Sequence, residues 1–76
     1  MKHDHFIDIK NMCCAGPIVL LTKRIKSMKD GDIILAESNS ISMINDIPAY
    51  CLSTKHELIK SEEKEGLYHF WIKVKK

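Results

Sequence analysis

The sequence predicts an α+β protein, a two-layer α/β sandwich in which two helices cover one face of a four-stranded mixed sheet. In some segments apolar and polar residues alternate, as in half-buried strands, and in others apolar residues recur at helical spacing. These segments follow one another in the order strand, helix, strand, helix, strand, strand. A chain of 76 residues has room for one domain, so we expect 1–76 to form a single domain.

The first half of the chain supplies two strands and a helix. A strand is predicted at 6–10, where apolar and polar side chains alternate. A helix is predicted to begin at Gly16 and Pro17, because proline suits the first helical position. Four apolar residues then recur at helical spacing: Ile18, Leu21, Ile25 and Met28. Asp30-Gly31 predicts a turn, and the apolar stretch 32–37 predicts a central strand.

The second half supplies a helix and a hairpin. A helix is predicted from Ile41 to about Thr54, with a bend or a restart at Pro48, because proline removes a backbone donor. Its buried side is expected to consist of Ile44, Ile47, Cys51 and Leu52. Strands at 57–62 and 67–74 form a hairpin through 63–66. In the last strand, alternation places Tyr68, Phe70, Ile72 and Val74 on one face and His69, Trp71 and Lys73 on the other.

Composition and charge exclude several classes of function. The net charge of +2 is too small to indicate nucleic-acid binding by itself. The longest apolar run, 17–21, is far shorter than the roughly 20 residues of a membrane span. The N-terminus has no apolar signal region, so we expect a cytoplasmic protein with no membrane partner. A chain of this size buries only about 60% of its unfolded surface, so its chemistry is expected at the surface.

The three cysteines are the strongest candidates for chemistry. An odd number, with no export signal, favours reduced thiols over disulfides. Cys14 lies just before the predicted helix start at Gly16 and Pro17, where unpaired N–H groups and the positive end of the helix dipole stabilise a thiolate. Cys14 is therefore the predicted nucleophile. The alternative is a small apolar residue at a loop–helix junction.

The remaining candidates favour structural interpretations. Cys51 falls on the apolar side of the second helix, where we expect a buried, inert thiol. His3 and His5 have ligand types for a metal together with Cys13 and Cys14, but the four residues have no recognised zinc spacing. We therefore expect no metal ion and no cofactor.

Motifs along nearly the whole chain resemble the TusA/SirA-like family of sulfur carriers. They are the opening strand Ile7-Asp-Ile-Lys-Asn-Met12, the Cys14-Ala-Gly-Pro17 segment, the Lys29-Asp-Gly-Asp32 turn, Asn45-Asp-Ile-Pro-Ala-Tyr-Cys51, the stretch from His56 through Leu58, and the closing Gly66-Leu-Tyr-His-Phe-Trp-Ile-Lys73. The family has Cys-Pro-x-Pro where this chain has 14–17, so Ala15 replaces a proline. Asn11 stands at the position of a family glycine, and Cys13 is an additional thiol.

The resemblance implies a fold like that of the C-terminal domain of a bacterial translation initiation factor. It also implies that Cys14 accepts sulfane sulfur as a persulfide, as a sulfurtransferase-type carrier rather than a free-standing enzyme. The sulfur would come from a protein donor, such as a cysteine desulfurase or a rhodanese-like protein. A protein acceptor would use it for transfer RNA thiolation, sulfur oxidation or cofactor synthesis. Cys13 could resolve the persulfide or share a metal with Cys14, but an incidental residue is the simpler interpretation.

The basic residues Lys23, Arg24 and Lys26 admit two interpretations. In a sulfur carrier they would dock an acidic donor protein. In an RNA-binding module the same residues and Lys29, with Trp71 and Lys73 on the open sheet face, would contact phosphates and stack on a base. We expect no direct nucleic-acid binding. A non-catalytic regulator that uses the open sheet face is a further alternative, and a monomer or a weak dimer is expected.

Overall fold

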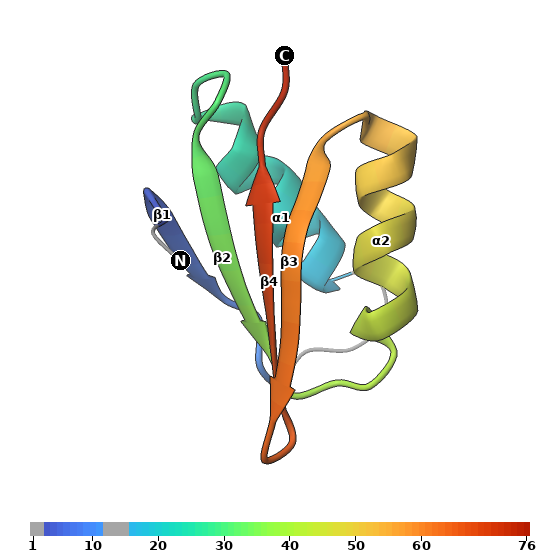
Figure 1. Cartoon of the computed structure of the whole chain (residues 1–76). Helices are drawn as coiled ribbons and strands as arrows, with labels where there is room; N and C mark the ends of the chain where they lie inside the picture. Colours follow the sequence, from blue (N-terminus) through green and yellow to red (C-terminus); the bar gives the residue numbers. More distant parts are fainter. Residues whose placement is uncertain (1–2, 12–15) are drawn as a thin grey trace.

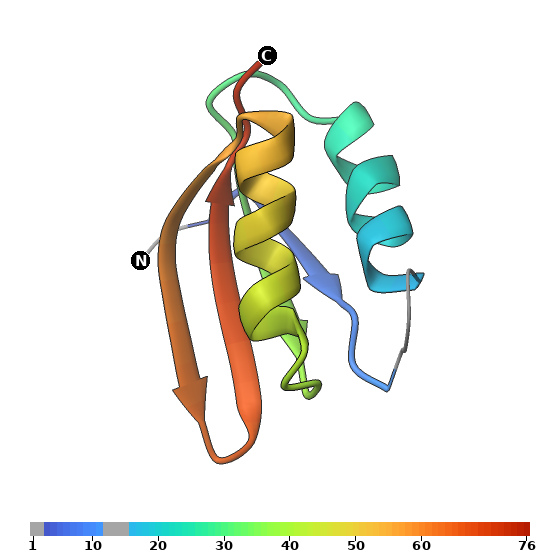
Figure 2. The same ribbon diagram turned by 90° about the vertical axis from the view of Figure 1, so that its right-hand side faces the viewer.

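The computed structural model describes residues 3–11 and 16–76 (Figure 1). Its elements are β1 (His5–Asp8), α1 (Gly16–Lys26), β2 (Ile33–Ser38), α2 (Met43–Thr54), β3 (Glu57–Lys64) and β4 (Leu67–Lys73). The two helices lie on the same face of the sheet (Figure 2). The predicted element order and the α+β class are confirmed.

The four strands form one mixed sheet in the order β1-β2-β4-β3. β1 pairs with β2 in parallel, because α1 carries the chain back across the sheet between them. The other two pairs are antiparallel, and the register places Ile34 opposite Ile72 and Ala36 opposite Phe70. β2 and β4 are therefore central, and β1 and β3 are the two edges (Figure 1).

The core lies between the helices and the sheet. Its fully buried or nearly fully buried members are Ile9, Leu21, Ile25, Met28, Ile34, Ala36, Met43, Ile47, Cys51, Phe70, Ile72 and Val74. Burial of apolar surface stabilises a fold by about 25 cal/mol per Å², so this cluster supplies most of the driving force. The predicted stripe on α1 is confirmed for Leu21 and Ile25, while Ile18 packs at the margin and Met28 lies beyond the last helical turn.

Two residues predicted to be buried on α2 face outwards. Ile44 is 46% exposed and Leu52 is 83% exposed, so that prediction is wrong. The row that faces the sheet is Met43, Ile47 and Cys51, spaced by four residues. The adjacent row has the same helical spacing, so periodicity alone could not choose between them. The position of the sheet makes the choice.

The helix α2 runs through Pro48 without a restart (Figure 2). The proline removes one intrahelical donor, the N–H that would reach the carbonyl group of Ile44, and the packing of the buried row compensates for that loss. The helix begins at Met43, two residues later than predicted, and ends at Thr54, with Lys55 as its C-cap. The φ angle of Lys55 is 65°, as in a left-handed C-cap.

The closing hairpin is tighter than the sequence predicted. β3 extends to Lys64, which pairs with Leu67, so the loop contains Glu65 and Gly66 alone. Both have positive φ, 52° and 82°, as two-residue hairpin turns require. On the sheet face away from the helices, Trp71 is 7% exposed, and the Lys60 ammonium lies 5.2 Å from its ring centroid. The sheet face opposite the helices is thus partly covered by its own side chains.

Candidate functional site

The predicted nucleophile belongs to the connection between β1 and α1. Cys13 and Cys14, like Met12 and Ala15, lie outside the described residues, whereas the residues on both sides are described. The carboxyl ends of β1 and β2 and the N-termini of both helices lie at the same end of the molecule (Figure 2). Both helix dipoles thus direct their positive ends towards this end.

Asn11 anchors the segment that leads to the two cysteines. Its backbone N–H donates to Oδ1 of Asn39 at 3.0 Å, and Nδ2 of Asn39 donates to Oδ1 of Asn11 at 2.9 Å. The φ angle of Asn11 is 61°, a left-handed conformation that asparagine tolerates better than other non-glycine residues. The backbone conformation therefore explains why asparagine can stand where the resembling family has glycine.

A row of charges holds the end of β1 against the sheet. The Lys10 ammonium hydrogen-bonds to Glu37 on β2 and lies 3.4 Å from Oδ2 of Asp8. The other carboxylate oxygen of Glu37 lies 3.2 Å from Nε2 of His69 on β4. The hydrogen bond from Lys10 holds the pKa of Glu37 below its usual value, and the same bond raises the pKa of Lys10. The chain is thus fixed at Lys10, two residues beyond β1 and one residue before Asn11.

The start of α1 anchors the other side of the cysteine segment. The helix begins at Gly16, and the next residue, Pro17, is fully buried. The first turn carries no acidic side chain, so the helix itself supplies no carboxylate that would neutralise the positive end of its dipole. A thiolate directly before this turn would be stabilised electrostatically. The structure therefore confirms a helix start at Gly16 and Pro17, two residues after Cys14.

A polar contact connects the two helices within the same layer. The hydroxyl oxygen of Thr22 lies 2.8 Å from the carbonyl oxygen of Ile18, one helical turn earlier on α1. It also hydrogen-bonds with the hydroxyl of Tyr50 on α2, at 3.0 Å. Together with the buried residues of α1, this contact fixes the helix in position against α2.

The three predicted docking residues lie at the far end of α1. Lys23, Arg24 and Lys26 form its last turn and are exposed. At about 1.5 Å per residue, Lys23 lies roughly 9 Å along the helix from Pro17. One of the three is engaged, because Nη2 of Arg24 donates to the carbonyl oxygen of Phe6 at 3.1 Å. A partner bound to these cations would have to extend along α1 to reach the cysteine segment.

The basic turn borders a shallow hollow between α1 and β1. The hollow has a volume of about 380 Å³ and is lined by Ile7, Leu20, Lys23, Arg24 and Ser27. Apolar walls beside two cationic side chains suit an acidic protein surface that also carries an apolar residue. The hollow lies on the same side as the basic turn, so both can belong to one docking surface.

Cys51 is buried, as predicted. The side chain is 3% exposed, and burial raises the pKa of its thiol to about 11. A thiol with that pKa is almost entirely protonated at neutral pH and is a poor nucleophile. Cys51 therefore belongs to the core rather than to the chemistry.

The histidines have structural partners. Nε2 of His5 lies 3.3 Å from Oδ2 of Asp32, and Nδ1 of His56 accepts a hydrogen bond from the N–H of Lys75 at 3.1 Å. Burial lowers the pKa of His56, which favours the neutral ring that this hydrogen bond requires. Within residues 3–11 and 16–76, no three His, Cys, Asp or Glu side chains are grouped so as to hold a metal ion.

Asn39, Glu37 and Tyr50 were not singled out from the sequence. Each hydrogen-bonds to a residue at least 27 positions away in the sequence, so no local motif could predict the pairing. The one available signal was that Asn11 stands where the family has glycine. That substitution is compatible with a left-handed backbone at Asn11, but it does not identify Asn39 as the hydrogen-bond partner.

The comparisons with known proteins give the family. The model of the family described as Sulfurtransferase TusA matches residues 5–74. The chain belongs to the TusA family. Its members include the sulfur carrier protein TusA of Buchnera aphidicola subsp. Baizongia pistaciae, 38% identical over 69 residues, which are 91% of this chain and 87% of that protein. The Pseudomonas entomophila TusA is 30% identical over 73 residues, covering 96% and 91% of the two chains.

TusA membership confirms the resemblance found in the motifs and supports a sulfur-carrier role with protein partners in a sulfur relay. The match spans both anchors of the cysteine segment, from β1 to α1, and continues through β4. Neither described helix is long and apolar enough to cross a membrane.

Proposed function

We propose that Cys14 receives sulfane sulfur from a protein donor in the cytoplasm, carries it as a persulfide and passes it to a protein acceptor. The observation that supports this role is the helix start at Gly16 and Pro17, which presents an uncompensated dipole two residues after the thiol. A surface thiolate in this position needs no enclosed pocket and no general base. The whole chain, 1–76, would act as a single carrier domain.

The transfer balances without a redox co-reactant. The Cys14 thiolate attacks the outer sulfur of the donor persulfide, the S–S bond of the donor breaks, and the donor thiolate leaves. The new bond gives a persulfide on Cys14. The acceptor thiolate then attacks the outer sulfur and releases the Cys14 thiolate unchanged. Cys13 has no part in this scheme, because adjacent cysteines form a strained disulfide.

Lys23, Arg24 and Lys26 support the docking of the donor. Their exposed charges at the end of α1 would attract an acidic surface and raise the rate of encounter. An RNA-binding module receives less support. Trp71, the ring that would stack on a base, is 7% exposed and lies beneath Lys60.

Mass spectrometry of the sulfur-loaded protein tests the proposal. The protein is incubated with a cysteine desulfurase and cysteine, or with polysulfide, and is then digested and weighed. We expect one added sulfur on the peptide that contains Cys13 and Cys14, its loss in Cys14→Ser, and its retention in the matched controls Cys13→Ser and Cys51→Ser.

Comparing the two sulfur sources distinguishes the reactivity of Cys14 from the docking of the donor, because the desulfurase must bind the protein and polysulfide need not. Reversal of charge at Lys23 and Lys26, by substitution with glutamate, should slow loading from the desulfurase and leave loading from polysulfide unchanged. If the wild type gains no sulfur from either source, or if Cys14→Ser gains as much, the carrier mechanism is wrong.

A further inference from the structure

Asn39, on the connection between β2 and α2, holds the chain just before the cysteine segment. The hydrogen-bond ladder between β1 and β2 extends past the end of β1, because the N–H of Ile9 donates to the carbonyl oxygen of Glu37 at 2.9 Å. Two residues later the N–H of Asn11 donates to Oδ1 of Asn39 at 3.0 Å, where a parallel ladder would continue with a backbone carbonyl. Nδ2 of Asn39 donates in return to Oδ1 of Asn11 at 2.9 Å. The side chain of Asn39 therefore adds one step to the ladder where the cysteine segment begins.

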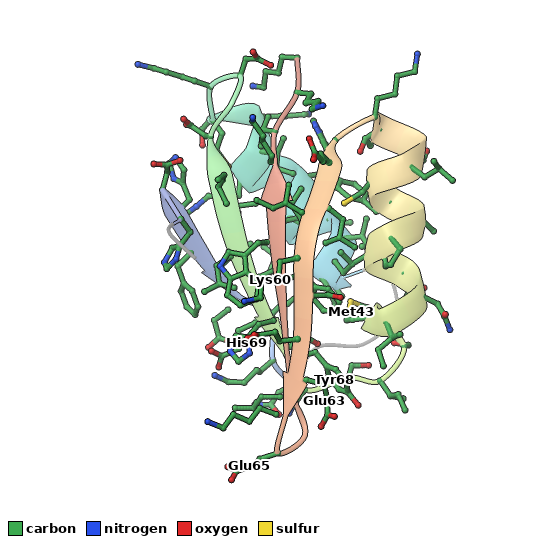
Figure 3. The ribbon with its side chains drawn as sticks, in the orientation of Figure 1. Met43, Lys60, Glu63, Glu65, Tyr68 and His69 are labelled. Carbon is green, nitrogen blue, oxygen red and sulfur yellow. The ribbon has the colours of Figure 1, made fainter. Side chains whose placement is uncertain are left out.

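The backbone of Asn39 is itself held in place by its two neighbours. Ser38, the last residue of β2, is fully buried, and its hydroxyl oxygen accepts a hydrogen bond from the N–H of Ser40 at 3.0 Å. A hydroxyl that bonds the N–H two residues later closes a compact turn, and Asn39 is the central residue of that turn. The connection ends at Met43, labelled in Figure 3, which begins α2 and is 1% exposed. The core therefore fixes the position from which the Asn39 side chain extends.

The backbone conformation of Asn11 depends on this support. Its φ angle of 61° costs free energy in any residue with a Cβ atom, although asparagine tolerates it better than most. The two hydrogen bonds to Asn39 favour this conformation over the extended ones that would otherwise compete with it. Both side chains are exposed, so water competes for these bonds and their contribution to global stability is modest. The main effect of the pair is thus on the direction in which the chain leaves β1.

That direction matters because the cysteine segment is short. Four residues, 12–15, connect Asn11 to Gly16, the first residue of α1. A connection of this length has far fewer accessible conformations when both of its ends are held than when one end is free. Cys14 is three residues from Asn11 and two from Gly16, so both anchors restrict it. The rate of a transfer between two thiols depends steeply on such restriction.

We propose that Asn39 is a positioning residue for sulfur transfer, which acts through Asn11 to restrict Cys14 to positions close to the start of α1. This inference rests on the proposed carrier function, because it concerns the same thiol. In the alternative, the asparagine pair stabilises the end of β1 and does nothing else. Its loss would then lower the free energy of unfolding and leave the reactivity of Cys14 unchanged.

The pH dependence of Cys14 alkylation distinguishes these two roles. The rate of reaction with iodoacetamide is measured over a series of pH values in a Cys13→Ser background, in which the other thiol, Cys51, is buried. A thiolate held at a helix start has a lowered pKa, so we expect Asn39→Ala to raise the apparent pKa of Cys14 by about half a unit or more. The kcat/KM of sulfur loading from a cysteine desulfurase should fall about threefold or more, because less thiolate is present at neutral pH. Asn45→Ala is the matched control, since Asn45 is also exposed and lies in the first turn of α2, and it should change neither quantity.

Two substitutions at Asn11 test the backbone conformation directly. Asn11→Gly retains the N–H that donates to Asn39 and adopts positive φ without strain, so it should keep the apparent pKa and the loading rate close to those of the wild type. Asn11→Ala retains the same N–H but disfavours positive φ, so it should behave like Asn39→Ala. Urea denaturation shows whether each variant is folded. If Asn39→Ala does not fold, the comparison of Asn11→Gly with Asn11→Ala decides the question.

The outcomes separate this proposal from the carrier function. A folded Asn39→Ala that is alkylated and loaded like the wild type, or that is only less stable, would overturn the positioning role. Equal behaviour of Asn11→Gly and Asn11→Ala would also overturn it, as would the same changes in Asn45→Ala. A wild type that gains no sulfur from any donor would contradict the carrier function instead.

Discussion

Asn11 shows how a single residue connects local conformation to the site. Its positive φ turns the chain out of β1, and its side chain and N–H both engage Asn39. The family resemblance placed Asn11 at a glycine position, and asparagine and glycine both tolerate the left-handed region that the structure shows there. It could not indicate Asn39, since that contact exists only after β1 and β2 have paired.

The burial of a single residue, Cys51, can be tested by its chemical reactivity. In a Cys13→Ser/Cys14→Ser background it is the one remaining thiol. Because burial raises its pKa from 9.0 to about 11, the folded protein holds the thiol protonated and hidden. We expect iodoacetamide at pH 8.5 to modify Cys51 only after unfolding in urea, as measured by mass spectrometry.

The same shift predicts the sign of an alkaline effect. A thiol whose folded pKa is raised stabilises the fold below its unfolded pKa, and this contribution is lost as the pH rises towards 11. The free energy of unfolding should therefore decline over that alkaline range, and Cys51→Ala should decline less. Rapid alkylation under native conditions would contradict the burial of Cys51.

At the scale of elements, the sequence predicted the order of helices and strands, but it predicted only in part which side of each element faces the core. The sequence predicted α2 but assigned two of its outward residues, Ile44 and Leu52, to the core. Two adjacent rows of α2 are apolar, and the choice between them depends on the sheet beneath. Alternation placed Phe70 and Trp71 correctly on opposite faces of β4, because a strand has just two faces.

The charge row across β1, β2 and β4 gives a prediction for the sheet. Glu37 receives a hydrogen bond from Lys10 and contacts His69, and its pKa is lowered from 4.5. A lowered carboxyl pKa stabilises the fold above the unfolded pKa, and that stability is lost as the pH falls through the folded pKa. We expect Glu37→Gln to be less stable at neutral pH and to lose less stability than the wild type between neutral pH and pH 3.

Urea titrations at a series of pH values measure this difference. Glu62→Gln is the control, because Glu62 forms a more exposed pair with Lys60 on the same face. It should change the stability less at neutral pH. If both variants follow the pH profile of the wild type, the contact between Lys10 and Glu37 does not contribute to stability.

At the scale of the whole molecule, the topology places the two regions of the proposed function, the cysteine segment and the basic turn, at opposite ends of α1. The cysteine segment joins β1 to α1 at the end where both helices begin. The basic turn lies at the other end of α1, and a hollow lined by Ile44, Pro48 and Tyr68 lies between α2 and the hairpin. Charge patterning along the sequence indicated the basic turn. It could not indicate that hollow, since α2 and β3–β4 meet only in the folded chain.

The core depends on the orientation of α2, which one pair of variants can test. Ile47 is fully buried against the sheet, whereas Leu52, on the same helix, is 83% exposed. Ile47→Ala should lower the free energy of unfolding by about 2–5 kcal/mol, because it removes buried methyl groups and leaves a cavity. Domains of this size have a total stability of roughly 4–11 kcal/mol, so the loss would be large. Leu52→Ala should change the stability by no more than about 0.5 kcal/mol.

Urea denaturation measures both variants, and an unchanged m value would show that each unfolds from the same compact state. The contrast is informative because both substitutions shorten an apolar side chain to alanine within one helix. Helix propensity therefore contributes little to the difference, and burial dominates it. If the two losses were equal, or if Leu52→Ala cost more, α2 would present its other row to the sheet. The row that contains Ile44, Pro48 and Leu52 would then belong to the core.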